Sequence, residues 1–135
     1  MREILFKAKR EDNGKWVEGN YVKKYDLSGK RHLILYVDNY VRWKCVGIDP
    51  KTLCQFTGLY DKNGKRIWEN DVVWLVYDGK KHIYQIIWDN SELDFKATNG
   101  EENYGSNFEY LLCCDEIEVI GNIFDNKELL QEEHK

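Results

Sequence analysis

The sequence has few residues of the kinds that interrupt secondary structure, form disulfides or bind metal ions. Its 135 residues include one Pro, three His and four Cys. No apolar run approaches the roughly 18 residues that a membrane-spanning helix needs. With 42% hydrophobic and 14% aromatic residues, the composition also excludes a disordered chain. We therefore expect one globular domain over residues 1–135 that does not enter a membrane.

The few cysteines are not expected to form disulfides. The first residues, "MREILFKAKRED", are charged throughout and lack the apolar stretch of a signal peptide. A cytoplasmic location follows as a prediction, and thiols stay reduced in that compartment. The four cysteines, Cys45, Cys54, Cys113 and Cys114, are therefore predicted to be free thiols.

Charge is unevenly distributed along the chain. Residues 1–67 hold 15 Lys and Arg against 8 Asp and Glu, which gives +7, whereas residues 68–135 hold 5 against 16, which gives −11. These values sum to the net charge of −4. The two halves could complement each other within one molecule or between copies, and the basic half could instead face nucleic acid.

Alternation of apolar and polar residues with a period of two dominates the chain and predicts strands. The expected strands cover 3–9, 16–25, 32–37, 40–46, 71–77, 81–89, 92–97 and 116–124, with a bulge at Gly121. Residues 108–114 fit a helix or a strand equally, and 71–77 is apolar on both faces, as in a strand covered on both sides. Pro50 favours a division into 1–50 and 51–135. Asp125 and Glu128 predict the cap of a short helix at 127–133.

One stretch, "TGLYDKNGKRIWEND" at 57–71, carries an unusual density of turn-forming residues. Gly58 and Gly64 permit positive φ, Asp61 and Asn63 can bond to nearby backbone, and Asn70 accepts a left-handed conformation. We predict a structural turn system with no reactive group. Its residues are Thr57, Gly58, Asp61, Asn63, Gly64, Ile67, Glu69 and Asp71.

The same stretch is similar to a known family. Trp16 with Gly19, then "QFTGLYDKNGKRIWENDVV" at 55–73, then "EVIGNIFDNKELL" at 118–130, resemble the YopX family of phage and prophage proteins. The departures from the family pattern are mild, and Asn70 in place of Gly keeps the backbone permissive. The resemblance spans nearly the whole chain. It implies a phage or prophage protein of uncharacterised function in a bacterial host cell, and it supplies no catalytic residue.

The predicted fold is mainly β, of the α+β type. A twisted antiparallel sheet is expected at the N-terminus, followed by a C-terminal half with a short helix. The segment "ENDVVWLVYDGKKHIYQIIW" at 69–88 is similar to SH3-like barrels, so that half is expected to form an SH3-like barrel half.

Neither catalytic nor metal-ligating patterns stand out. Of the histidines, His134 lies at the C-terminal end, and His32 and His82 lie in predicted strands. Cys45 and Cys54 lie on apolar segments, where Cys packs as a small hydrophobic residue. Vicinal Cys113 and Cys114 lack the spacing of a zinc site, although a long-range Cys and His site stays open. We predict no catalytic, cofactor or metal site.

Nucleic-acid binding by the N-terminal half is the alternative function. Basic residues interleave there with Trp and Tyr, as in small β folds that hold single strands. The candidate residues are Lys7, Arg10, Lys23, Lys24, Arg31, Arg42 and Lys44. The sequence pI of about 5.4 counts against it. The favoured prediction is a non-enzymatic interaction protein that binds copies of itself or another phage or host protein.

Overall fold

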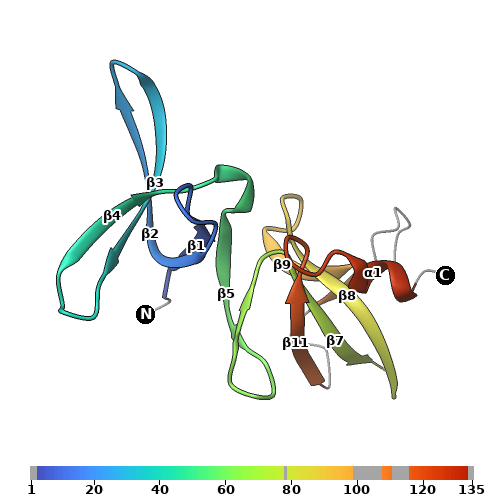
Figure 1. Cartoon of the computed structure of the whole chain (residues 1–135). Helices are drawn as coiled ribbons and strands as arrows, with labels where there is room; N and C mark the ends of the chain where they lie inside the picture. Colours follow the sequence, from blue (N-terminus) through green and yellow to red (C-terminus); the bar gives the residue numbers. More distant parts are fainter. Residues whose placement is uncertain (1–2, 78, 99–107, 111–115, 134–135) are drawn as a thin grey trace. The chain divides into compact units, whose positions relative to one another are not determined.

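The computed structural model describes residues 3–77, 79–98, 108–110 and 116–133. The chain divides into two compact units, Met1–Phe56 and Thr57–Lys135 (Figure 1). Over the described ranges the protein consists of antiparallel strands, one 3-10 turn and one short C-terminal helix. The mainly-β prediction is therefore confirmed. The chain is divided after Phe56, and the proline pattern favours a division after Pro50.

The first unit is built from consecutive hairpins. Strands β1 (Phe6–Lys9), β2 (Trp16–Asp26), β3 (Gly29–Val37) and β4 (Trp43–Gly47) pair in sequence order, as the turn residues between them predict. After the 3-10 turn η1 (Pro50–Thr52), strand β5 (Cys54–Tyr60) pairs with β1 and completes the predicted antiparallel sheet. Fully buried Ala8, Ile34 and Ile48 form the centre of this unit's core.

Gly19 makes the change of strand partner possible in the middle of β2. Gly19 is paired with Phe6 of β1, and the next residue, Asn20, begins the pairing with Leu35 of β3. A Cβ at position 19 would overlap the backbone carbonyl oxygen of Leu35. Only a glycine lets the two backbones approach so closely at this point.

The β3–β4 connection differs from the prediction, which began a strand at residue 40. The Asp38 carboxylate accepts hydrogen bonds from the backbone N–H groups of Tyr40 (2.9 Å) and Arg42 (3.0 Å). These bonds hold a turn in which Val41 has φ of 60°, so β4 starts only at Trp43. The sequence pattern predicts a strand at Tyr40 and Val41 because both residues are typical of strands. The pattern does not reveal the Asp38 side-chain hydrogen bonds that form a turn there instead.

The second unit contains the end of β5, β6 (Arg66–Trp68) and a separate five-stranded sheet. That sheet is formed by β7 (Asp71–Tyr77), β8 (Lys80–Asp89), β9 (Asp94–Thr98), β10 (Phe108–Tyr110) and β11 (Glu116–Asn122), in the order β10-β9-β8-β7-β11. Val72 and Val73, neighbours on opposite faces of β7, are both fully buried, as predicted for a strand covered on both sides. The helix α1 (Glu128–Glu133) confirms the predicted C-terminal helix.

The predicted SH3-like barrel half is not closed in the part of the chain that the structure describes. Strands β10 and β11 lie at opposite edges of the five-stranded sheet, so the sheet is open. Alternation and turns fix strands and neighbouring hairpins, but closure depends on register and shear, which the pattern does not contain. The bulge at Gly121 is confirmed by a shift in the β11–β7 register. Of the ambiguous segment, 108–110 is strand, while Cys113 and Cys114 lie outside the described residues.

Candidate functional site

Asp61 is the centre of the turn system between β5 and β6. Its carboxylate accepts hydrogen bonds from the backbone N–H groups of Asn63 (2.8 Å), Lys65 (2.9 Å) and Val119 (2.9 Å). Burial raises the pKa of this carboxyl, but the three N–H donors outweigh burial and lower the pKa below its usual value. Asp61 is therefore ionised at neutral pH, and its carboxylate oxygens are engaged in hydrogen bonds to backbone N–H groups.

The turn also covers the outer edge of the second sheet. The backbone N–H of Lys62 donates to the carbonyl oxygen of Ile117 (2.9 Å), next to the Asp61 bond to Val119. The side-chain amide of Asn63 donates a hydrogen bond to the Glu118 carboxylate (3.4 Å) rather than to nearby backbone. The Lys62 ammonium lies 3.8 Å from the Glu116 carboxylate. The motif thus satisfies backbone groups of β11, an edge strand that would otherwise be open to pairing.

The rest of the motif fixes the path from β5 to β7. The hydroxyl of Thr57 donates to the carbonyl oxygen of Ile67 (2.7 Å), and the Asp71 carboxylate accepts from the Trp68 N–H (2.8 Å). Asn70, with φ of 71°, donates its N–H to Ile86 (2.7 Å).

The remaining predicted motif residues occupy turn or core positions. Gly58 and Gly64 have φ of 89° and 81°, Ile67 is fully buried, and Glu69 is half-buried between β6 and β7. The Asp61 and Asp71 carboxylates accept hydrogen bonds from different backbone segments: Asp61 from its own turn and from β11, and Asp71 from Trp68. Across the described residues, no group of three or more His, Cys, Asp or Glu is arranged to hold a metal ion. The hydrogen bonds of the motif position the backbone of β5, β6 and β11.

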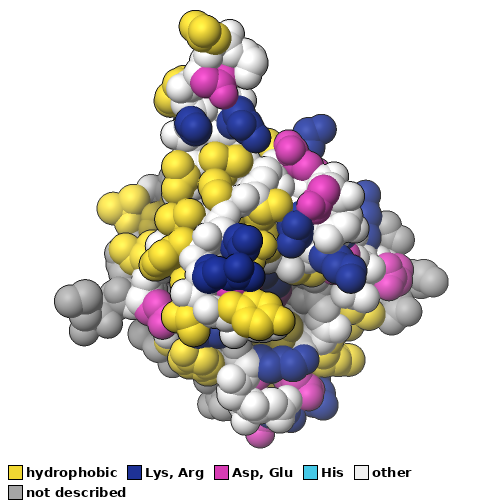
Figure 2. Space-filling view, turned by 60° about the vertical axis from the view of Figure 1, so that its left-hand side comes forward, with side chains coloured by type: hydrophobic (Ala, Val, Ile, Leu, Met, Phe, Trp, Pro, Cys, Tyr) yellow, Lys and Arg dark blue, Asp and Glu magenta, His cyan; other side chains and the backbone are white. Residues whose placement is uncertain are grey.

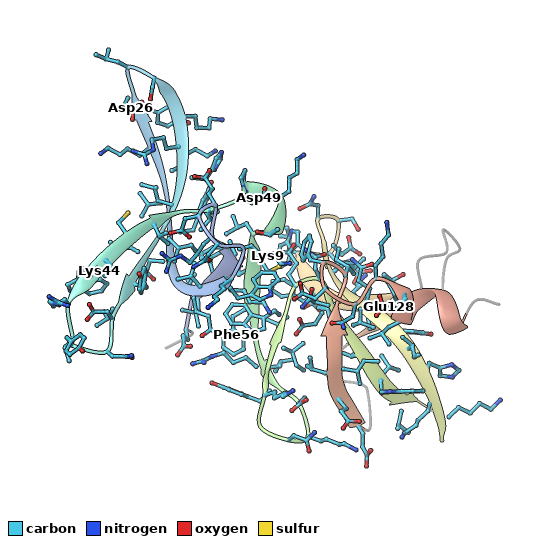
Figure 3. All side chains as sticks on the ribbon, in the orientation of Figure 1. Lys9, Asp26, Lys44, Asp49, Phe56 and Glu128 are labelled. Carbon is cyan, nitrogen blue, oxygen red and sulfur yellow. The ribbon has the colours of Figure 1, made fainter. Side chains whose placement is uncertain are left out.

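The predicted basic residues lie in the first unit, and the register divides them between two faces of its sheet. Opposed residues of antiparallel strands point to the same side, and alternate residues point to opposite sides. Lys24 therefore shares a face with its partner Arg31, whereas Lys23 lies on the other face with its partner His32. Lys44, labelled in Figure 3, is paired with Tyr36 and shares the face of Lys23.

Three of the predicted basic residues already have partners within the chain. The ammonium of Lys7 lies 4.6 Å from the centre of the Trp16 ring. Arg10 forms an ion pair with Asp12 at 2.8 Å, and Arg42 forms one with Asp38 at 3.4 Å. The structure does not gather the seven residues into one continuous surface.

Comparison with known proteins identifies the family of the chain. The family model described as YopX protein matches residues 5–131. The chain belongs to the YopX family. A crystal structure of protein EF1440 from Enterococcus faecalis has a similar fold, with a TM-score of 0.54 and 22% sequence identity. The match covers 96% of this chain and 99% of that one. No curated protein matches the chain.

Cysteine and histidine are not juxtaposed in the first unit of this YopX-family chain. Cys45 is opposite Leu35 and points to one face of the sheet, whereas His32 points to the other face. His32 accepts or donates a hydrogen bond at Nδ1 with the hydroxyl of Tyr21. Cys54 is buried, and Cys45 is exposed on the edge strand β4 rather than packed in the core. Both are free thiols, as predicted.

One charged cluster of the second unit was not predicted. The ammonium of Lys96, a side chain with only 6% exposure, lies 2.7 Å from Asp89 and 3.1 Å from Glu92. The Lys96 hydrogen bond, with help from Ser91, holds the pKa of the Asp89 carboxyl well below its usual range. The only signal in the sequence is that Lys96 stands between apolar residues of a strand. The structure explains this lysine: it forms an internal ion pair of the β8–β9 hairpin.

The helical content has a bearing on membrane insertion. Over the described residues, no helix combines the necessary length with sufficient apolar character.

Proposed function

We propose that this chain is a non-enzymatic accessory protein of phage or prophage origin that binds further copies of itself. The observation that carries the proposal is the exposure and backbone conformation of Val41. This β-branched residue is 83% exposed and has φ of 60°, a conformation that such side chains adopt only at a cost. Asn or Gly would serve an isolated turn better, so an exposed valine there indicates a contact that the isolated chain lacks.

Val41 does not stand alone. Together with three neighbours it forms an apolar surface that we term the β3–β4 patch: Val37, Tyr40, Val41 and Trp43, which are 46%, 78%, 83% and 66% exposed. Val37 and Trp43 are register partners and therefore share a face. Burying one such side chain is worth about 1.5–3 kcal/mol, so covering the patch would offset a substantial part of the cost of association.

Charge favours a second copy as the occupant of the patch. Residues 1–56 hold 12 Lys and Arg against 7 Asp and Glu, giving +5, and residues 57–135 hold 8 against 17, giving −9. Arg42 and Lys44 border the patch in sequence, and both are exposed. Arg42 is paired with Asp38, whereas Lys44 and the net positive charge of the first unit suit the acidic second unit of another molecule, because complementary charges orient and accelerate association.

Val41→Asn and its matched control test the proposal. We expect light scattering on the unmodified chain to show a concentration-dependent oligomer that weakens between about 50 mM and about 500 mM salt. Val41→Asn should weaken the oligomer while stabilising the monomer, because it relieves the turn. Ile4→Asn changes another exposed aliphatic residue of the first unit, outside the patch, and it should leave association unchanged. A monomer at every ionic strength would overturn the proposal.

Single-stranded nucleic-acid binding is the second candidate function. The observation in its favour is that alternation from Trp16 along β2 places Lys7, Lys24 and Arg31 on the same face as Trp16. Bases stack on aromatic rings and cations hold the nucleic-acid backbone, and Trp16 is half-buried with the Lys7 ammonium over its ring. Quenching of Trp fluorescence by a single-stranded oligonucleotide, lost in Trp16→Leu, would support it; unchanged fluorescence at low salt would exclude it.

A further inference from the structure

The distal half of the β2–β3 hairpin is a two-stranded ribbon that projects from its unit (Figure 1). We term residues 23–31 the β2–β3 arm. Its register pairs Lys23 with His32, Lys24 with Arg31 and Tyr25 with Lys30. Every residue from 23 to 31 is exposed. Neither face of the arm is therefore covered by the rest of the described unit.

The arm carries a strong positive charge with few internal partners. It holds the four cations Lys23, Lys24, Lys30 and Arg31 and one carboxylate, that of Asp26. The Asp26 carboxylate accepts hydrogen bonds from the backbone N–H (2.9 Å) and hydroxyl (2.5 Å) of Ser28, so it shapes the turn at the tip. Within the described ranges, none of the four cations forms an ion pair within 4.0 Å.

The cations point to both sides of the ribbon. Lys24 and Arg31 are opposite each other and share one face. Lys23 lies on the other face, as does Lys30, whose ammonium is 6.0 Å from the Tyr25 ring. A flat acidic partner would meet cations on one face only. A ribbon that is basic on both faces fits a partner with two anionic walls.

We propose that the β2–β3 arm inserts into the major groove of double-stranded DNA. That groove is about 12 Å wide and about 8.5 Å deep and admits a two-stranded β-ribbon, with a phosphate backbone on each side. Five residues of a strand span about 16 Å, which is enough to carry the arm's tip to the groove floor. The four cations then contact phosphates on both walls.

The tip of the arm is apolar, which suits the floor of the groove. Leu27 is fully exposed and Tyr25 is 70% exposed. Figure 2 shows Lys and Arg side chains along the projection, below a hydrophobic tip. Apolar side chains contact the methyl group of thymine, which lies on the major-groove floor. Duplex RNA offers a deep, narrow major groove that side chains do not read, so the proposal is specific for B-form DNA.

Fluorescence anisotropy with a labelled DNA duplex of about two helical turns tests the inference on the full chain. We expect the Kd to rise about 100-fold between 50 and 200 mM salt, because four phosphate contacts give a log–log slope of about −3.6. The arm variant, with Lys23, Lys24, Lys30 and Arg31 each changed to Gln, should lose at least about 10-fold in affinity at 50 mM salt and most of that slope.

The matched control removes two cations from another hairpin. Lys80→Gln with Lys81→Gln changes exposed residues at the start of β8 and should leave DNA affinity unchanged. A double variant of the arm, Lys24→Gln with Arg31→Gln, provides the equal change in charge and should halve the salt slope. Leu27→Ser should weaken binding without altering the slope, since it removes an uncharged contact. Unchanged circular dichroism would show that each variant is folded.

The possible outcomes separate this inference from the proposed function. Duplex binding lost in the arm variants and retained in the β8 control supports it. Absence of duplex binding at 50 mM salt, equal binding of single strands or duplex RNA, or equal loss in the β8 control would overturn it. Should the arm variants abolish self-association without any DNA binding, the arm belongs to the interface between copies. Failure of self-association alone would leave the DNA inference standing.

Discussion

Asp61 connects the sequence motif to the fold through a single carboxylate. It is 7% exposed and accepts three backbone hydrogen bonds, one of them from Val119, 58 positions along the chain. Asp61→Asn keeps the shape of the side chain but removes the charge and one acceptor oxygen. We expect the free energy of unfolding of the second unit to fall by about 1–3 kcal/mol in urea titrations. Asp94→Asn, at an exposed position, should have little effect.

The effect of Asp61→Asn should depend on pH. The pKa of Asp61 is lowered in the folded state, so the folded chain binds fewer protons than the unfolded chain. The stabilisation is complete above the unfolded pKa of about 4 and is lost as the pH falls through the lower folded value. The difference between wild type and Asp61→Asn should therefore be full at pH 7 and shrink below about pH 4. A difference that stays constant down to pH 2 would contradict this assignment.

Gly19 provides a second test at the scale of one residue. Adding a methyl group there forces it against the carbonyl oxygen of Leu35, so β2 and β3 must separate. We expect Gly19→Ala to lower the stability of the first unit by about 3 kcal/mol or more. Gly14→Ala, in a turn with φ of 71° and open space around it, should cost only about 1 kcal/mol. Equal losses in thermal unfolding would show that the close approach is unimportant.

At the scale of elements, the β8–β9 hairpin depends on its internal ion pair. Lys96 is the first cause of the lowered pKa of Asp89. In Lys96→Met the carboxylate keeps its bonds to Ser91 but loses the ammonium. We expect the pKa of Asp89, measured by NMR titration, to rise toward the ordinary value near 4. Ser91→Ala should raise it less, and an unchanged pKa in Lys96→Met would show that the pair does not form in solution.

Strands were easier to predict than connections. The hairpin at β7 and β8 has alternating residues and an Asp-Gly turn, both of which are local signals. The start of β4 was misplaced because Asp38 bonds to the backbone four residues away. The strands of the second sheet were predicted, but the described residues do not confirm an SH3-like barrel half. Asp61 could be recognised as a turn former, but its bond to Val119 could not, since no local pattern links positions 58 residues apart.

For the whole molecule, the central feature is that charge and hydrophobic exposure are divided between two units. The first unit has a charge of +5, the exposed β3–β4 patch and the basic β2–β3 arm. The second unit has a charge of −9 and an edge strand covered by the motif turn. Among the described residues, the exposed large hydrophobic side chains therefore lie mainly in the first unit. The family motif contributes to the integrity of the second.

This division predicts how the molecule unfolds. The core of the first unit is built around Ala8, Ile34 and Ile48, and the core of the second around residues such as Ile67 and Leu75, with no member in common. In hydrogen exchange with increasing urea, Gly19→Ala should lower the protection of residues 6–47 and spare residues 71–98. Asp61→Asn should do the reverse. If each variant lowered protection equally in both segments, the chain would unfold as one cooperative unit, and binding could not be assigned to the first unit without regard to the second.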